Sequence, residues 1–166
     1  SEGMGSRHAV QTMRNAIYAR LKRPAIVEAS EWGHWSWYYH SRMGAWDHPH
    51  WGLKRFVDRH VADIATYRLG ALVQAQLGWW AVLGPGPANR AATEDEMEYF
   101  CCKSLAYDAP WSLLMPGLLT APANARMLEY ITMAGWYERL RLANYFPEPV
   151  LKQLRAAGRE FHLEQA

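Results

Sequence analysis

The segment from Glu28 to Trp51 gathers aromatic, acidic and basic side chains more densely than the rest of the chain. It holds five of the nine tryptophans, and four histidines lie among them. Aromatic rings stack on the C–H faces of a sugar, while polar side chains bind its hydroxyl groups. The segment therefore predicts a carbohydrate site, and its candidate contacts are Trp32, Trp35, Trp37, Arg42 and Asp47.

Two acidic residues in this part of the chain are candidates for catalysis. Glu28 lies near the end of an apolar run, PAIVEAS, and Asp58 lies within a second one, RFVDRHV. Cleavage of a glycosidic bond requires two carboxyl groups, because one protonates the leaving oxygen while the other attacks the sugar or activates water. Glu28 is the candidate general acid/base and Asp58 a candidate second carboxylate. Further polar or aromatic residues predicted to line the site are His60, Gln76 and Trp79.

Each candidate also has an interpretation that needs no ligand. Glu28 could pair with Arg42, and Arg42 could instead pair with Asp47 to brace the loop. If RFVDRHV is a helix, Asp58 is a solvated surface acid. Aromatic clusters also fill cores, and adjacent strand residues such as Trp79 and Trp80 point to opposite faces, so at most one of them lines a site.

The sequence contains no motif typical of a metal or cofactor site. His48 and His50 flank a proline next to Asp47, but no H-E-x-x-H or paired-cysteine pattern supplies fixed ligands. Cys101 and Cys102 are adjacent, a spacing poorly suited to a structural disulfide, and in a helix at most one of them should face inward. We therefore predict no metal, no other cofactor and no cysteine nucleophile.

Composition sets the broad class of protein. The chain has 166 residues, of which 50% are hydrophobic, enough for one domain with a real core. Its net charge of +2 comes from mixed acidic and basic residues, so no face for nucleic acid is expected. The longest apolar run, near Leu77 to Leu83, falls far short of the roughly 20 residues of a membrane span.

The hydrophobic pattern predicts helices that alternate with buried strands. RFVDRHV fits either a strand or a helix, and the wider alternation favours the strand. Thr93 and Glu96 form a T-x-x-E capping box that starts a helix to about Tyr107. The whole pattern predicts an α/β fold with parallel strands. The other expected elements are a helix from Ser6 to Lys22, strands in 24–30, 71–83 and 109–115, and helices at 124–144 and 148–157 with Gly158 as a stop.

In this order, the chain resembles the C-terminal half of a glycoside-hydrolase (β/α)8 barrel. Residues 1–6, SEGMGS, match the loop after the fourth strand, and PAIVEAS, RFVDRHV, QAQLGWW and APWSLLM match strands five to eight. Endo-α-N-acetylgalactosaminidase-like and α-amylase-like barrels place an acid/base glutamate after strand five, which corresponds to Glu28. Their nucleophile after strand four would fall at or before Ser1, with Glu2 as a stand-in.

This resemblance implies a partial barrel of about four parallel strands, spanning residues 1–166 as a fragment of a larger catalytic domain. The implied partners are a carbohydrate substrate and either the missing half of the barrel or a second copy that covers open strand edges. By analogy, the protein would be periplasmic or secreted. Two alternatives remain: a non-catalytic carbohydrate-binding or scaffold domain, and a mostly helical interaction protein if RFVDRHV and QAQLGWW are helical.

Overall fold

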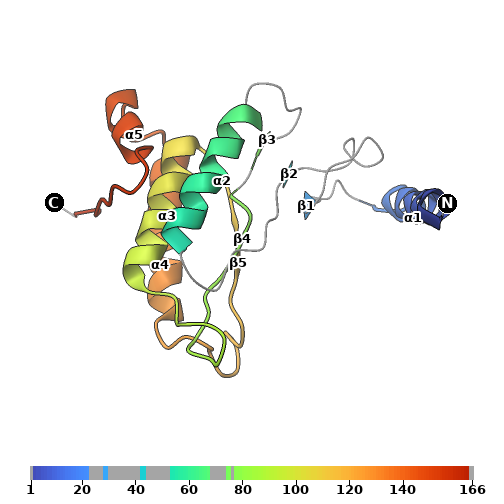
Figure 1. Ribbon diagram of the computed structural model, residues 1–166, viewed down its shortest axis with the longest axis horizontal. Helices are drawn as coiled ribbons and strands as arrows, with labels where there is room; N and C mark the ends of the chain where they lie inside the picture. The colour runs from blue at the N-terminus through green and yellow to red at the C-terminus, as the bar shows by residue number, and fades with distance from the viewer. Residues whose placement is uncertain are drawn as a thin grey trace.

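Five helices and five short strands make up the part of the chain that a computed structural model describes, residues 2–22, 28–29, 42–43, 53–67, 74–75 and 77–164 (Figure 1). The helices are α1 (Glu2–Tyr18), α2 (Leu53–Tyr67), α3 (Glu94–Tyr107), α4 (Met127–Leu142) and α5 (Glu148–Leu154). The strands are β1 (Glu28–Ala29), β2 (Arg42–Met43), β3 (Gln74–Ala75), β4 (Trp79–Ala81) and β5 (Ser112–Leu114).

The strands form two small parallel sheets. One has the order β1-β2-β3 and the other pairs β4 with β5. Helix α3 connects β4 to β5, as a parallel pair requires a crossover rather than a tight turn. After β5 the chain continues into α4, which packs against α3.

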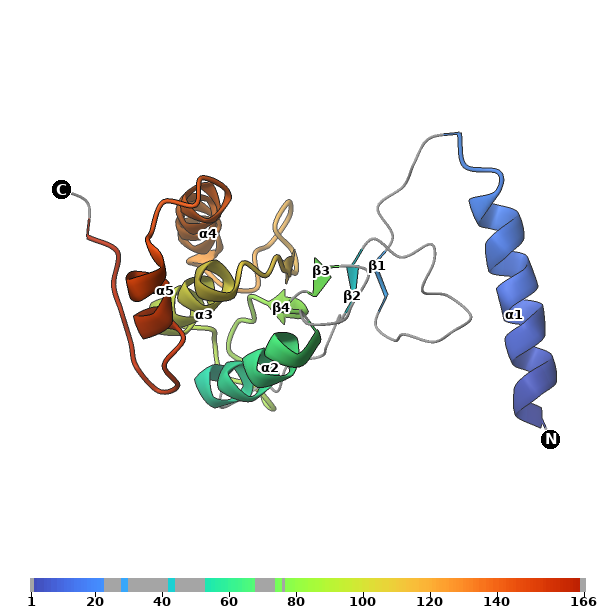
Figure 2. The same cartoon turned by 90° about the horizontal axis from the view of Figure 1, so that it is seen from above.

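Helix α3 lies at the centre of the helical layer, between α2 and α4 in Figure 2. From Glu96 to Ala106, every residue of this helix except Glu98 is buried. On one side, Phe100 contacts the Trp80 ring of β4, with ring centroids 4.0 Å apart. On other sides, α3 packs against α4 and α5 through Leu105 and Tyr137. A helix surrounded in this way needs no polar face, which explains its continuous burial.

The predicted start and end of α3 are confirmed. The Thr93 backbone N–H donates to the Glu96 carboxylate over 3.2 Å, which closes the predicted capping box. At the other end, Asp108 takes a left-handed conformation with φ 47° and terminates the helix after Tyr107. Acidic residues in the first turn also match the positive end of the helix dipole.

The predicted partial (β/α)8 barrel is wrong. RFVDRHV lies inside helix α2. The described residues are mostly helical, and their two sheets are small and separate. The physical reason lies in the apolar spacing: Leu53, Val57 and Val61 recur every four residues and pack on Trp80 and Phe100. This spacing places the three residues on one face of α2 and buries that face. In a strand, the same residues would alternate between two faces.

Two further expectations, one about residues 1–6 and one about the cysteines, need correction. Residues 2–6 are helical and do not form the predicted loop, because α1 begins at Glu2, and α1 lies apart from α2 to α5 in both views (Figures 1 and 2). Cys101 and Cys102 are both buried, since α3 is covered on more than one side. The expectation that at most one cysteine faces inward therefore fails.

The two C-terminal helices match the sequence pattern. α4 lies within the predicted 124–144, and α5 begins at Glu148 as expected but ends earlier, at Leu154. Gly158 has φ +70°, a conformation that favours glycine, and turns the chain back along α3. Among the described helices, none is both long enough and apolar enough to cross a membrane.

Candidate functional site

Three of the polar residues on the first sheet share one row of its ladder. Glu28 of β1 is in register with Arg42 of β2, and Arg42 is in register with Gln74 of β3. Because the strands are parallel, their carboxyl ends lie at the same edge of the sheet. In parallel sheets, ligands bind beyond that edge. Each of the three residues begins its two-residue strand, so the row lies one position before that edge. The register therefore brings two predicted site residues, Glu28 and Arg42, to neighbouring positions and adds Gln74, which the sequence analysis did not single out.

The remaining predicted contacts divide between residues outside the described ranges and residues of β4. Trp79 is paired with Ser112 of β5 in the second sheet. Its neighbour Trp80 is buried, and the Trp80 indole N–H donates to the Leu77 carbonyl over 2.7 Å. Trp80 is therefore a core residue. The predictions that lie outside the described residues are Trp32, Trp35, Trp37, Asp47 and Gln76.

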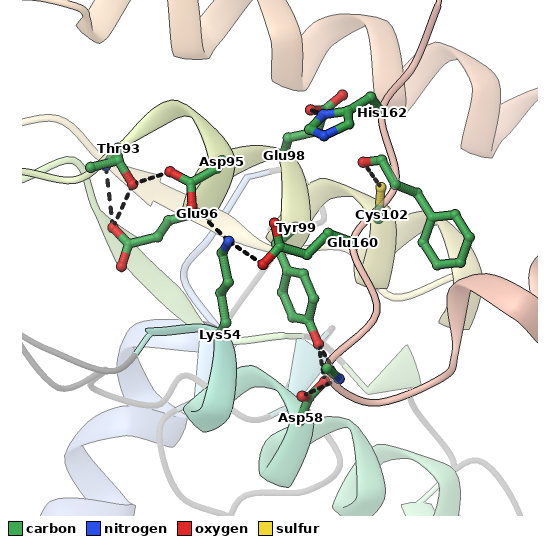
Figure 3. Close-up of polar contacts among 12 residues, drawn as sticks. Lys54, Asp58, Thr93, Asp95, Glu96, Glu98, Tyr99, Cys102, Glu160 and His162 are labelled. Atoms are coloured by element: carbon green, nitrogen blue, oxygen red, sulfur yellow. Dashed lines mark hydrogen bonds and ion pairs between the residues drawn. The ribbon is translucent and has the colours of Figure 1, made fainter.

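Asp58 stabilises the fold instead of facing a strand-end site. Its side chain is 17% exposed, and its two carboxylate oxygens accept from the Tyr99 hydroxyl at 2.6 Å and from the Gly158 backbone N–H at 3.0 Å. Figure 3 shows Asp58 and Tyr99 pointing toward each other from α2 and α3. Neither earlier interpretation of Asp58 fits, because it is not on a strand and not a solvated surface acid. Both carboxylate oxygens of Asp58 already accept hydrogen bonds from other residues of the chain.

His60, the second residue predicted to line a strand-six site, belongs to the core. It lies one helical turn after Phe56 on α2 and is buried. Its ring stacks on Phe56 with centroids 6.1 Å apart. We therefore interpret His60 as a packing residue of α2.

Lys103 is the most unusual ionisable residue in the described part of the chain. It is 0% exposed, and its ammonium donates to the backbone carbonyls of Leu154 at 2.9 Å and Ala156 at 2.6 Å. Asp58 lies 3.6 Å away, and the Tyr99 ring lies beneath the ammonium. Burial lowers the pKa of Lys103, although the nearby Asp58 carboxylate opposes that effect. Two hydrogen bonds and one ion pair hold the ammonium, so this lysine ties α2, α3 and the C-terminal segment together.

The C-terminal segment, residues 156–164, is held along α3 by a second set of polar contacts (Figure 3). The Glu98 carboxylate accepts from the Tyr137 hydroxyl at 2.8 Å and from the Leu163 backbone N–H at 2.9 Å, and it lies 2.6 Å from His162 Nδ1. Glu160 accepts from Lys54 at 2.6 Å. These contacts fix the segment over a helix that would otherwise expose polar groups.

The contact between His162 and Glu98 makes part of the stability depend on pH. The hydrogen bond and the charge of Glu98 raise the pKa of His162 above 6.5. Burial raises the pKa of Glu98, but the hydrogen bonds from Leu163, His162 and Tyr137 outweigh it and leave that pKa below 4.5. The contribution of His162 is thus complete below about pH 6.5 and is lost as the pH rises through its raised pKa. That of Glu98 is lost as the pH falls through its lowered pKa.

We expect His162→Gln to destabilise the chain at pH 5.5 and to have a smaller effect at pH 8.5, because the imidazolium exists only at the lower pH. Urea denaturation of both proteins at the two pH values measures the difference. An equal loss at both pH values would show that the charge on His162 does not contribute.

Neither cysteine is suited to nucleophilic chemistry. Burial raises the pKa of the Cys101 thiol strongly, and it raises the pKa of Cys102 to about 11. Cys102 lies 3.5 Å from the Tyr137 hydroxyl and 3.7 Å from the Phe161 carbonyl oxygen. Because the thiolate is the reactive form, these environments keep both side chains inert at neutral pH.

A cavity of about 310 Å³ lies between β5 and α4. The walls are mostly apolar, and the one carboxylate among them, Glu138, is held by two hydrogen bonds from Arg141. A sugar needs several polar partners, so this cavity suits it less well than the row on the first sheet. The lining residues are Pro110, Trp111, Leu113, Met115, Ile131, Ala134, Gly135 and Glu138.

Sequence reasoning missed the cluster around Lys103. The signal is present in α3, where Glu98 and Cys102, and likewise Tyr99 and Lys103, are four residues apart and so share faces of the helix. That spacing alone does not reveal which segment covers those faces. Within the described residues, no group of three or more histidine, cysteine, aspartate or glutamate side chains is arranged to hold a metal ion.

The chain matches no protein-family model, no curated protein and no solved structure. The resemblance to glycoside hydrolases therefore stays a prediction from the residues alone.

Proposed function

We propose that this protein is carbohydrate-active, with its sugar site at the row formed by Glu28, Arg42 and Gln74. The single observation that carries the proposal is the register of β1, β2 and β3, which places Glu28, Arg42 and Gln74 at neighbouring positions on parallel strands. These three groups supply the acceptors and donors that sugar hydroxyls require.

The order of the chain supports the same location. The segment with Trp32, Trp35 and Trp37 follows the carboxyl end of β1, and the segment with Asp47 follows that of β2. Gln76 comes directly after β3. Segments that leave the carboxyl ends of parallel strands start at the same edge of the sheet. The segments with the aromatic residues predicted to bind sugar thus begin two positions after Glu28 and after Arg42, at one edge of the sheet.

In this proposal, Glu28 acts as the general acid/base of glycosidic-bond cleavage, since it is the one carboxylic acid in the row. A carboxylic acid in that role protonates the leaving oxygen and then activates water. Asp58 is not the second carboxylate, because its oxygens are bound to Tyr99 and Gly158.

A non-catalytic carbohydrate-binding domain is the second candidate function. It is favoured by a specific observation: on the described part of the sheet, Glu28 is the one carboxylate in the row, whereas hydrolysis needs two. A binder requires neither a second carboxylate nor an acid of raised pKa. Both functions share the same sugar site and differ in turnover.

Calorimetric titration of the chain with a panel of neutral oligosaccharides tests the shared site. We expect at least one oligosaccharide to bind, and Arg42→Ala to weaken binding by about tenfold, the effect of losing one hydrogen bond from a charged group. Arg139→Ala is the matched control, since Arg139 is an exposed arginine on α4, and it should bind as the wild type does. Absence of binding across the panel, or equal binding by Arg42→Ala, would overturn the proposal.

A further inference from the structure

Helix α1 carries apolar side chains that the described residues do not bury. Val10 is 40% exposed, and Met13 and Ile17 are each 56% exposed. Residues three and four apart lie on one face of a helix, so these side chains form a stripe along α1. A backbone hydrogen bond from the Leu21 N–H to the Tyr18 carbonyl extends the turn to Leu21, which is 46% exposed. We call Val10, Met13, Ile17 and Leu21 the α1 stripe.

Basic side chains border the α1 stripe. The described side chains of α1 and of the turn after it include Arg14, Arg20 and Lys22, all exposed, but no carboxylate. At about 3.6 residues per turn, Arg14 lies on the Val10 side of the stripe and Arg20 on the Met13 side. The ion pairs between described residues involve none of these three bases. Within the described chain, the stripe therefore lies between positive charges that no acidic side chain neutralises.

The opposite face of α1 is polar. Gln11 Nε2 donates to Asn15 Oδ1 over 3.0 Å, and the Thr12 hydroxyl donates to the His8 carbonyl over 2.9 Å. Both contacts are exposed to water. The helix thus has an apolar stripe, basic borders and a polar back. This division is typical of a helix that lies in a membrane interface with its apolar face toward the lipid chains.

We propose that α1 binds the surface of a membrane that contains anionic lipids. The α1 stripe enters the boundary between headgroups and acyl chains, and the three bases bind lipid phosphates at its borders. Charge complementarity selects this occupant, because a nucleic acid would neutralise the bases but leave the stripe exposed to water. An acidic protein would need a matching apolar groove, whereas an anionic lipid surface offers both chemistries everywhere. The proposal rests on α1 alone and is independent of the proposed sugar site.

Vesicle flotation of the whole chain tests the proposal. The probes are vesicles of phosphatidylcholine alone and vesicles in which about a third of the lipid is phosphatidylserine. We expect the chain to bind the anionic vesicles at least tenfold more tightly than the neutral ones, because each base near an anionic surface contributes about fivefold. Binding to the anionic vesicles should weaken as the salt concentration is raised, since salt screens the attraction.

Two variants that add the same charge separate the stripe from the net charge. Met13→Glu places a carboxylate in the α1 stripe and should weaken binding to the anionic vesicles by about tenfold or more. Thr12→Glu adds the same charge on the polar face, further from the lipid, and should weaken binding by less than about threefold. Glutamate is a good helix former and α1 lies apart from α2 to α5 (Figures 1 and 2), so both variants should keep the helical circular dichroism of the wild type.

Three results would overturn the proposal. The first is a wild-type chain that binds neither kind of vesicle, or both equally well. The second is an equal loss of binding in Met13→Glu and Thr12→Glu, which would show that the stripe does not enter the membrane. The third is binding to poly-L-glutamate or to duplex DNA without binding to vesicles, which would assign the basic borders to an acidic protein or to a nucleic acid.

Discussion

Lys103→Met is expected to lower the free energy of unfolding by about 3–5 kcal/mol, the usual cost of removing one partner from a buried charged network. The substitution removes three donors from a side chain that is 0% exposed. It leaves the carbonyls of Leu154 and Ala156 without their hydrogen bonds, and Asp58 loses its cation. Because methionine fills a similar volume, the loss reports the polar contacts more than a cavity.

Urea denaturation followed by circular dichroism measures this loss. Lys152→Met is the matched control, since Lys152 is an exposed lysine on α5, and its effect should stay within about 0.5 kcal/mol. The double variant Lys103→Met, Asp58→Asn should lose less than the sum of the single losses, because the two side chains belong to one network. A loss below about 1 kcal/mol for Lys103→Met, within the range of an ordinary neutral hydrogen bond, would contradict the assigned role.

Glu28→Gln is expected to lower kcat for a natural glycoside by about 10²–10⁴-fold, the usual contribution of a general acid. Glutamine has nearly the same shape but cannot donate a proton to the leaving oxygen. A substrate with an activated, weakly basic leaving group needs less protonation, so the variant should lose less of its activity on it. Binding affinity should change little. Glu164→Gln, at an exposed residue near the C-terminus, is the control.

The outcome of this substitution separates the two candidate functions. If the wild-type chain binds an oligosaccharide without turning it over, and Glu28→Gln binds equally well, the protein is a binder. If the wild-type chain turns over substrate and Glu28→Gln does so at the same rate, Glu28 is not the acid/base. Only a large loss of kcat at nearly unchanged affinity supports the catalytic role.

The sequence predicted α3 and α4 because the signals that define these helices lie within their own residues. The capping box of Thr93 and Glu96 satisfies backbone donors within one turn, so it fixes the start of α3 whatever packs against it. The long periodic pattern of α4 is similar in this respect. In contrast, RFVDRHV fits two periods, and the choice between them depends on contacts with Trp80 and Phe100, which come from later in the chain.

The polar groups show the same limit of sequence reasoning. Asp58 binds Gly158, a residue 100 positions later, so no local pattern around Asp58 indicates its role. The register of Glu28 and Arg42 is also a property of strand pairing and not of either segment alone. Their neighbouring positions are compatible with both roles predicted from the sequence, an ion pair and a catalytic acid. Turnover by Glu28→Gln decides between them.

Amide hydrogen exchange with and without a bound oligosaccharide tests the location of the sugar site most directly. The account predicts slower exchange in peptides that contain β1, β2 and β3, because ligand at the polar row protects the strands that carry it. Peptides from β5 and α4, which line the apolar cavity, should exchange at unchanged rates. Protection confined to β5 and α4, or absent throughout a saturated complex, would contradict a sugar site at Glu28, Arg42 and Gln74.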